Sequence, residues 1–279
     1  MRMVMTLLSF FIIAQILGIY TGVFVLLDLT HNPFVSDLIV TSDTEEPINA
    51  LFFIVYIILA AAAMVLLIRY LGLYLIIFRI MEFGLIASAS SIVFYAFMRI
   101  FLGYELSTII AIFAGLVFSG IKVFRPQLKN AAAIIATAGV GVVFGISLGI
   151  IPLIIFLMML AVYDYLSVFA TKHMVEMATY IVKKDLAFTI TAKEKPKMLG
   201  ERERRIDLGT GDIIAPIMLE VSALTINPIA SLFVFVGAII SMAIFLTLVF
   251  KKGMVLPALP PIVLGMIASL LFGLLIGAY

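Results

Sequence analysis

Long apolar runs are the feature that most constrains what this chain can fold into. Nine of them follow one another along the sequence, each close to the roughly 20 residues that an α-helix needs to cross a hydrocarbon core. The runs are Met3–Leu27, Ile48–Ile68, Leu71–Met98, Leu106–Ile121, Ala131–Ile150, Ile151–Ala170, Leu208–Ile226, Ile229–Phe250 and Leu256–Ala278. Because only 12% of the residues are charged, an ordinary water-soluble domain is excluded. The pattern predicts an all-α, polytopic membrane protein with nine transmembrane helices.

The positions of the Lys and Arg residues predict how these helices are oriented. If the N-terminus is cytoplasmic, sixteen of the 18 fall on the cytoplasmic side, and only Arg99 lies on an outer loop. This distribution obeys the positive-inside rule. The connection Asp28–Pro47, which carries acids but no Lys or Arg, then lies outside, as does Tyr279. We therefore expect a multi-pass protein of the cell membrane with a cytoplasmic N-terminus and an external C-terminus.

One long polar segment divides the chain into three parts. Residues 1–170 hold the first six predicted spans, residues 171–207 are predicted to be cytoplasmic, and residues 208–279 hold the last three spans. Apolar residues between Met174 and Val182 recur at helical spacing opposite charged residues, which predicts an amphipathic helix at the membrane interface. The remainder, Asp185–Arg205, is interpreted as a flexible loop because its charges are well solvated.

Several kinds of chemistry are excluded or disfavoured by the residues that are missing. The chain has no Cys, so thiolate nucleophiles and thiolate metal sites are excluded. Its two histidines, His31 and His173, are far apart in sequence, and no His-Glu-x-x-His zinc motif is present. We therefore expect neither a metal nor a cofactor. A net charge of +2 with dispersed basic residues also argues against a nucleic-acid partner and leaves the lipid bilayer as the expected surroundings.

Four acidic residues fall inside the apolar runs, where ionisable side chains are costly and are candidates for function. Glu82 follows Arg79 by three residues, a spacing that predicts a structural ion pair on one helix. Glu220 has no evident cationic partner, so we expect a buried hydrogen bond or exposure at the outer interface. The other two acids are Asp164 and Asp212.

Asp164 and Asp212 are predicted to share one depth in the membrane. Asp164 precedes Lys172 by eight residues and Asp212 follows Arg205 by seven, which places both about 10–12 Å from the cytoplasmic boundary. They stand on consecutive spans that run in opposite directions. Two facing carboxyl groups in a poorly solvated site cannot both ionise easily, so one keeps its proton while the other can activate water. The pattern is typical of an aspartic protease.

The sequences around these acids have structural as well as functional interpretations. Gly209 and Gly211 let another backbone approach Asp212, although glycines in membrane helices more often serve packing. Tyr163 could order the carboxylate beside it, but most tyrosines in spans are packing or interface residues. Pro257-Ala258-Leu259 begins a predicted helix, where proline is common. The same prolines also leave backbone groups unpaired, which could bind an unwound substrate as an added strand.

Taken together, three motifs resemble those of one family. Tyr163-Asp164, Gly209-Thr210-Gly211-Asp212 and Pro257-Ala258-Leu259 match, in order and spacing, the Tyr-Asp, Gly-x-Gly-Asp and Pro-Ala-Leu motifs of the presenilin and signal peptide peptidase family. The chain looks like a prokaryotic, archaeal-type presenilin homologue. The resemblance implies an intramembrane aspartyl endopeptidase with Asp164 and Asp212 as its catalytic pair, acting on transmembrane helices of protein substrates. It also implies that Tyr163, Gly209, Thr210, Gly211, Pro257, Ala258 and Leu259 shape the active site or bind substrate.

Two other functions stay open at this point. A cation or proton leak channel, or a coupled transporter, could use the same aspartates, but transporters often show internal repeats and none is evident here. A prepilin or preflagellin peptidase also uses Gly-x-Gly-Asp, although the Tyr-Asp and Pro-Ala-Leu segments argue against it. Association of the chain into a homo-oligomer is a further prediction that the sequence does not decide.

Overall fold

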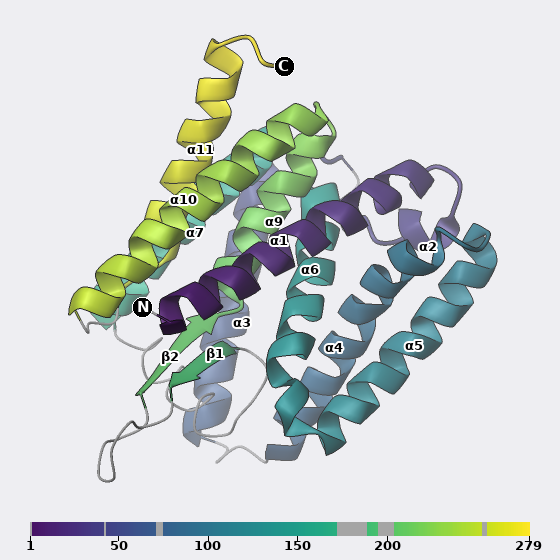
Figure 1. Cartoon of the computed structure of the whole chain (residues 1–279), viewed down its shortest axis with the longest axis horizontal. Helices are drawn as coiled ribbons and strands as arrows, with labels where there is room; N and C mark the ends of the chain where they lie inside the picture. The colour runs from purple at the N-terminus through teal and green to yellow at the C-terminus, as the bar shows by residue number, and fades with distance from the viewer. Residues whose placement is uncertain (1, 42, 71–74, 172–188, 195–203, 253–255) are drawn as a thin grey trace.

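The protein is a bundle of helices with one small β-hairpin at its end (Figure 1). The computed structural model describes residues 2–41, 43–70, 75–171, 189–194, 204–252 and 256–279. Its long helices are α1 (Arg2–Asp28), α3 (Ile48–Tyr70), α4 (Leu75–Met98), α5 (Tyr104–Phe124), α6 (Lys129–Ser147), α7 (Ile150–Leu166), α9 (Gly211–Leu224), α10 (Pro228–Lys252) and α11 (Leu259–Leu275). The short elements are α2 (Pro33–Ser36), the helical turns Pro126–Leu128 and Ser167–Thr171, and strands β1 (Thr189–Glu194) and β2 (Arg204–Gly209).

Each of the nine predicted apolar runs overlaps one of these long helices. Within the described part of the chain, six are long and apolar enough to cross a membrane: α1, α4, α5, α6, α7 and α10. Helices α9 and α11 are shorter, with 14 and 17 residues, and the described apolar part of α3 is Ile48–Ala60. The structure therefore confirms a mostly helical, multi-pass membrane architecture.

Two predicted spans start later than expected, and both differences concern the candidate site. The seventh was predicted from Leu208, but Leu208 lies in β2 and α9 begins at Gly211. The ninth was predicted from Leu256, but α11 begins at Leu259, followed directly by the two prolines that favour a helix start. Apolar composition cannot separate a buried strand or extended segment from the helix that follows it.

The predicted flexible loop is also partly wrong. Within Asp185–Arg205, Thr189–Glu194 forms β1, which pairs antiparallel with β2. Ile190 and Ala192 alternate with polar residues and are buried, a period-two pattern typical of a strand. Because charged residues surround this short pattern, it was interpreted as part of the loop. The amphipathic helix predicted between Met174 and Val182 lies outside the described residues.

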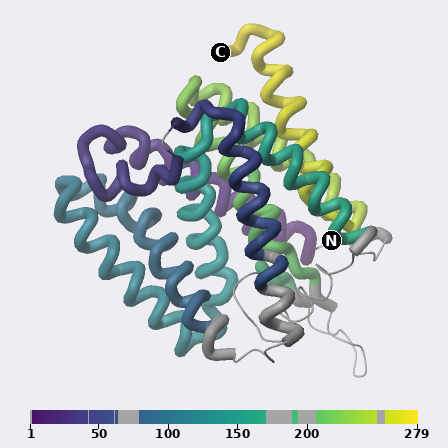
Figure 2. Tube along the Cα trace, turned by 180° about the vertical axis from the view of Figure 1, so that it is seen from behind, coloured from purple at the N-terminus to yellow at the C-terminus, as the bar shows by residue number. Residues whose placement is uncertain are grey.

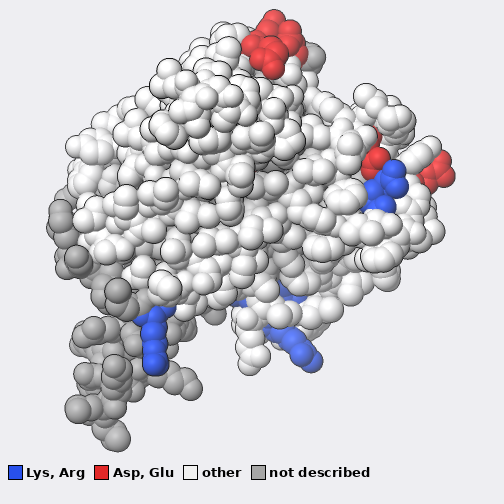
Figure 3. Space-filling view, turned by 45° about the horizontal axis from the view of Figure 1, so that its top comes forward, with Lys and Arg blue, Asp and Glu red and all other residues white. Residues whose placement is uncertain are grey.

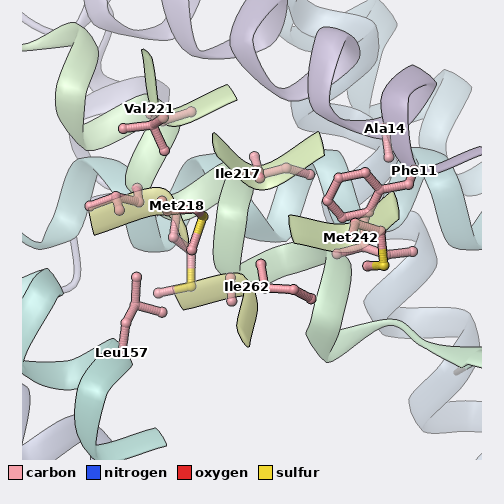
Figure 4. Close-up of a cluster of buried hydrophobic side chains, with 14 of the residues drawn as sticks. Phe11, Ala14, Leu157, Ile217, Met218, Val221, Met242 and Ile262 are labelled. Carbon is pink, nitrogen blue, oxygen red and sulfur yellow. The ribbon is translucent and has the colours of Figure 1, made fainter. Parts of the chain in front are cut away.

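Helix α9 lies at the centre of the bundle and organises its packing. In Figure 1, α4 and α5 form one side, α10 and α11 the other, and α1 crosses α9. Viewed from behind, α3 lies against α7 (Figure 2). Figure 4 shows Ile217, Met218 and Val221 of α9 among Phe11 of α1 and Ile262 of α11. Burying α9 on nearly all sides fixes the helix that carries Asp212.

Small residues bring the neighbouring helices close to α9. A side chain added at Gly141 of α6 would collide with Ile217, and one added at Gly145 would collide with Val221 and the Met218 carbonyl. On the α1 side, Gly18 is in similarly close contact with Ile217. Close backbone approach of this kind is a common basis of helix association in membranes. Helix α9 is thus packed closely between α1 and α6.

Two buried acids in the first half of the chain are paired with cations. Asp28, at the end of α1, accepts hydrogen bonds from Arg99 Nε at 2.6 Å and from the Tyr95 hydroxyl at 2.6 Å. Hydrogen bonding to Asp28 raises the pKa of Arg99 above its ordinary value, so this cation keeps its charge. Glu82 of α4 forms a salt bridge with Lys122 of α5, both side chains being almost completely buried. The sequence had predicted Arg79 as the partner of Glu82, and the structure instead supplies Lys122 from the neighbouring helix.

Candidate active site

Asp164 lies in the last turn of α7, and its side chain is 5% exposed. Its carboxylate accepts a hydrogen bond at 3.3 Å from the backbone amide of Leu259, the first residue of α11. The Ala258 amide is close enough to act on the same carboxylate. These amides are available because the first residues of a helix have no intrahelical acceptor. The Pro-Ala-Leu segment therefore contacts Asp164 through its backbone.

Asp212 is the second residue of α9, directly after the strand-to-helix junction. Strand β2 ends at Gly209, Thr210 occupies the N-cap position, and Gly211 begins the helix. A side chain added at Gly209 would lie 3.3 Å from Asp212 Oδ2, so a larger residue there would press on the carboxylate. The first turn of a helix also favours negative charge because its amides point outward. The Gly-x-Gly-Asp sequence thus connects an extended strand to a helix and presents Asp212 at the junction.

Both aspartates line one cavity of about 550 Å³. They are close enough for the charge of Asp164 to act on Asp212. Of the other predicted site residues, Tyr163, Gly209, Gly211, Pro257, Ala258 and Leu259 line the same cavity, while Thr210 lies between two of them in the chain. The remaining walls are mainly apolar: Ile57, Val140, Phe144, Phe156, Leu160, Val168, Ile214, Ala215, Met218 and Leu256. The cavity brings together segments that are far apart in the sequence.

One polar residue of the cavity wall was missed by the sequence interpretation. Asp207, in β2, lines the cavity and accepts a hydrogen bond at 2.5 Å from the Thr191 hydroxyl of β1. It closely follows the charged segment that was interpreted as a solvated loop, and it was therefore not predicted as a site residue. The signal that could have found it is the short alternation of apolar and polar residues leading to Gly209.

No cationic side chain pairs with Asp164 or Asp212 among the residues that the structure describes. The same residues contain no group of three or more His, Cys, Asp or Glu side chains that could hold a metal ion. The site thus consists of two neighbouring carboxyl groups in a mainly apolar cavity, with backbone amides on one side. Such an arrangement can exchange a proton and can hydrogen-bond to a carbonyl group.

Comparison with known proteins shows the family of the chain. The family model described as "Signal-peptide peptidase, presenilin aspartyl protease" matches residues 8–278. The chain belongs to this family. As a member of it, the protein is an aspartic endopeptidase of the membrane, and the resemblance inferred from the three motifs is confirmed. No match was found among curated proteins.

Solved structures show the same fold. A presenilin family intramembrane aspartate protease, crystallised in space group C222, superposes with a TM-score of 0.69 over 98% of this chain and 99% of that chain. A second structure of a presenilin family intramembrane aspartate protease, in space group P2, gives a TM-score of 0.65 over 94% of this chain and 96% of that chain. Both are 22% identical to this chain. The presenilin-like fold is therefore confirmed.

Proposed function

We propose that this family member cleaves peptide bonds within or near transmembrane helices of protein substrates, with Asp164 and Asp212 as its catalytic pair. The observation that carries the proposal is that both carboxyl groups line one mainly apolar cavity of about 550 Å³. The family match supports the protease prediction and gives no support to the channel, transporter or prepilin-peptidase alternatives.

The proposed reaction follows from the chemistry of two neighbouring carboxyl groups. Because both cannot ionise easily so close together, one holds a proton and the other is charged. The charged carboxylate takes a proton from a water molecule as the water oxygen attacks the substrate carbonyl carbon. The protonated carboxyl group donates a hydrogen bond to that carbonyl and stabilises the developing oxyanion. Collapse of the tetrahedral intermediate then breaks the C–N bond, as the carboxyl group that took the proton from water transfers it to the leaving amine.

The substrate helix must unwind locally before this step, because the hydrogen bonds of a helix shield its peptide bonds from water. We propose that a locally unwound substrate binds along backbone next to the aspartates, at Pro257–Leu259 and at the end of β2. Supporting this, Leu259 is buried and its amide contacts Asp164, while Gly209 of β2 lies against Asp212. Tyr163, Thr210, Gly211 and Ala258 are proposed to shape the same site.

The direct test is cleavage of a single-span model substrate by the purified protein in detergent. We expect the wild type to cleave it and the variants Asp164→Ala and Asp212→Ala to be inactive while keeping their helical circular dichroism. Hydrolysis retained in either folded variant would contradict the assignment of the pair. Changing Leu259 tests the binding step separately: a Leu259→Gly variant with unchanged KM and kcat would exclude a role for this segment in substrate capture.

We further propose nine transmembrane spans, with the N-terminus in the cytoplasm and the C-terminus outside. In the face shown by Figure 3, Lys and Arg side chains lie mainly at the lower end, although blue atoms are also seen at the right beside acidic ones, and Asp and Glu side chains lie at the upper end and at the right. The two chain termini also lie at opposite ends of the bundle (Figure 1). Cysteine labelling of single-Cys variants at each end tests this orientation. The three-part division at residues 170 and 207 and self-association of the chain stay predictions.

A further inference from the structure

The side chain of Asn130 makes an unusual contact with the hairpin next to the site. Asn130 lies in the first turn of α6 and is half-buried. Its Nδ2 donates to the Thr191 carbonyl oxygen at 2.8 Å, and the Thr191 amide donates to its Oδ1 at 3.0 Å. One side-chain amide thus provides the donor and the acceptor that a neighbouring strand would provide. Asn130 therefore occupies the outer edge of β1 in the place of another strand.

This contact determines which way the backbone groups of the hairpin point. Thr191 pairs with Asp207 in the antiparallel register, and Thr189 pairs with Gly209. Because the amide and carbonyl of Thr191 both bind Asn130, they point away from β2, so Thr191 and Asp207 form a non-hydrogen-bonded pair. The alternation of an antiparallel ladder makes Thr189 and Gly209 such a pair as well. The backbone amides and carbonyls of Asp207 and Gly209 then point away from β1.

The two edges of the hairpin therefore have different surroundings. On the β1 side, Asn130 covers the edge, and the strand packs against α1 and α6. On the β2 side, Asp207 and Gly209 line the cavity that contains both aspartates. The Gly209 amide acts on the Asp212 carboxylate, as its outward direction requires. Because an uncovered strand edge is a template for another chain, covering the β1 edge directs pairing to the β2 side, where Asp207 and Gly209 line the cavity.

A second contact connects β1 to β2 through their side chains. The Thr191 hydroxyl donates a hydrogen bond to Asp207 Oδ1 at 2.5 Å, and the backbone amide of the same threonine binds Asn130. Three residues beyond Gly209 in the chain is Asp212. A continuous series of hydrogen bonds therefore leads from α6 through β1 to the cavity wall, and only a short connection separates that wall from Asp212.

We propose that Asn130 is a positioning residue for proteolysis: its side chain blocks the β1 edge and fixes the hairpin on α6, so that a substrate strand meets only the β2 edge, in one register. The proposal rests on the proposed function, because it presumes a substrate that binds in extended form beside the aspartates. Asn130 does not line the cavity, and it acts through Thr191 and Asp207.

The test compares Asn130→Ala with wild type in the full-length protein in detergent, using a single-span model substrate. Two hydrogen bonds that hold the hairpin are lost, so we expect KM to rise about tenfold with a smaller change in kcat. We also expect additional cleavage positions by mass spectrometry, because strand register is weakly specified once the hairpin can shift. The matched control is Gln127→Ala, which changes an exposed residue three positions earlier and should leave KM and cleavage positions unchanged.

A double-mutant cycle separates positioning from general stability. Thr191→Pro removes the amide that Asn130 binds, and by the register above it removes no hydrogen bond between the strands. Asn130→Ala and Thr191→Pro should therefore be non-additive in KM. If Asn130→Ala lowers only the melting temperature while KM and the cleavage positions match wild type, the proposal is overturned. If the alanine variant does not fold, Asn130→Asp, which keeps an acceptor for the Thr191 amide, is measured in the same way.

Failure of this proposal is distinguishable from failure of the proposed function. If wild type cleaves the substrate only when both Asp164 and Asp212 are present, and Asn130→Ala behaves as wild type, only the positioning role is wrong. If wild type does not cleave any single-span substrate, the proposed function itself is contradicted and the positioning role falls with it.

Discussion

The buried acids of the two halves of this protein differ in their partners. In the first half, Asp28 is held by Arg99 and Glu82 by Lys122. In the second half, Asp164, Asp212 and Glu220 have no cationic partner among the described residues. Glu220 is completely buried in α9, and in the part of the chain that the structure describes neither of its carboxylate oxygens has a hydrogen-bond partner. The sequence had predicted a hydrogen bond or exposure for Glu220, and the structure shows neither.

This difference indicates what each acid can do. An acid that is paired with a cation in a poorly solvated place stays charged, and it contributes to the position of two helices. An acid without a cation can exchange a proton, which an aspartic protease requires of its catalytic pair. Paired acids in this fold therefore serve structure, and unpaired ones are candidates for chemistry. The following variants test this distinction, from the largest expected effect to the smallest.

Removing charge from the proposed catalytic pair should affect activity far more than stability. We expect Asp164→Asn and Asp212→Asn each to lower kcat by about 10³-fold or more, because an amide cannot transfer the proton. Their melting temperatures in detergent should stay near that of wild type, since no salt bridge is lost. Cleavage assays and thermal unfolding of the same preparations measure both quantities. A folded asparagine variant that retained near-normal kcat would contradict the distinction.

Removing the cation from Glu82 should have the opposite effect. Lys122→Leu removes the cation that forms a salt bridge with the buried Glu82 carboxylate, and we expect the free energy of unfolding to fall by about 3–5 kcal/mol. The double variant Glu82→Leu with Lys122→Leu should recover most of this loss, because no buried charge remains. Specific activity of the folded fraction should be unchanged. A double variant as unstable as the single one would show that packing, not charge, explains the loss.

The Asp28–Arg99 pair should matter less, because the Arg99 side chain is 30% exposed. We expect Arg99→Gln to lower the free energy of unfolding by about 1–3 kcal/mol, because the Tyr95 hydroxyl still donates a hydrogen bond to Asp28. Urea or thermal unfolding measures this change. A loss equal to that of Lys122→Leu would mean that exposure does not decide the strength of these pairs.

Replacing Glu220 should stabilise the protein slightly. Leucine has a similar volume and no polar group to bury, so we expect Glu220→Leu to raise the free energy of unfolding by about 1–2 kcal/mol. The matched control is Glu220→Gln, which keeps a buried polar group and should raise the free energy of unfolding by less. A lower kcat in a folded Glu220→Leu variant would instead indicate that this acid takes part in the reaction. All three unpaired acids would then contribute to activity.

The helices formed by the apolar runs, and the shared depth of two acids on different runs, were predictable from the sequence. The runs predicted every long helix, and the distances from Lys172 and Arg205 predicted that Asp164 and Asp212 share a depth; both aspartates line one cavity. The partner of Glu82 was not predictable, since Lys122 is on another helix and only packing brings the two together. The β-hairpin was hidden among charges, and the contribution of Asn130 could not be seen without it.

By itself, the sequence determined that this protein lies in a membrane and which segments form its long apolar helices, because burial of apolar groups depends on composition and local period. It also determined the family, through three short motifs. The tertiary structure alone decided which acids are paired, where the seventh and ninth helices begin, and which edge of the hairpin faces the aspartates. Those features depend on contacts between segments far apart in the chain, and no local pattern encodes such contacts.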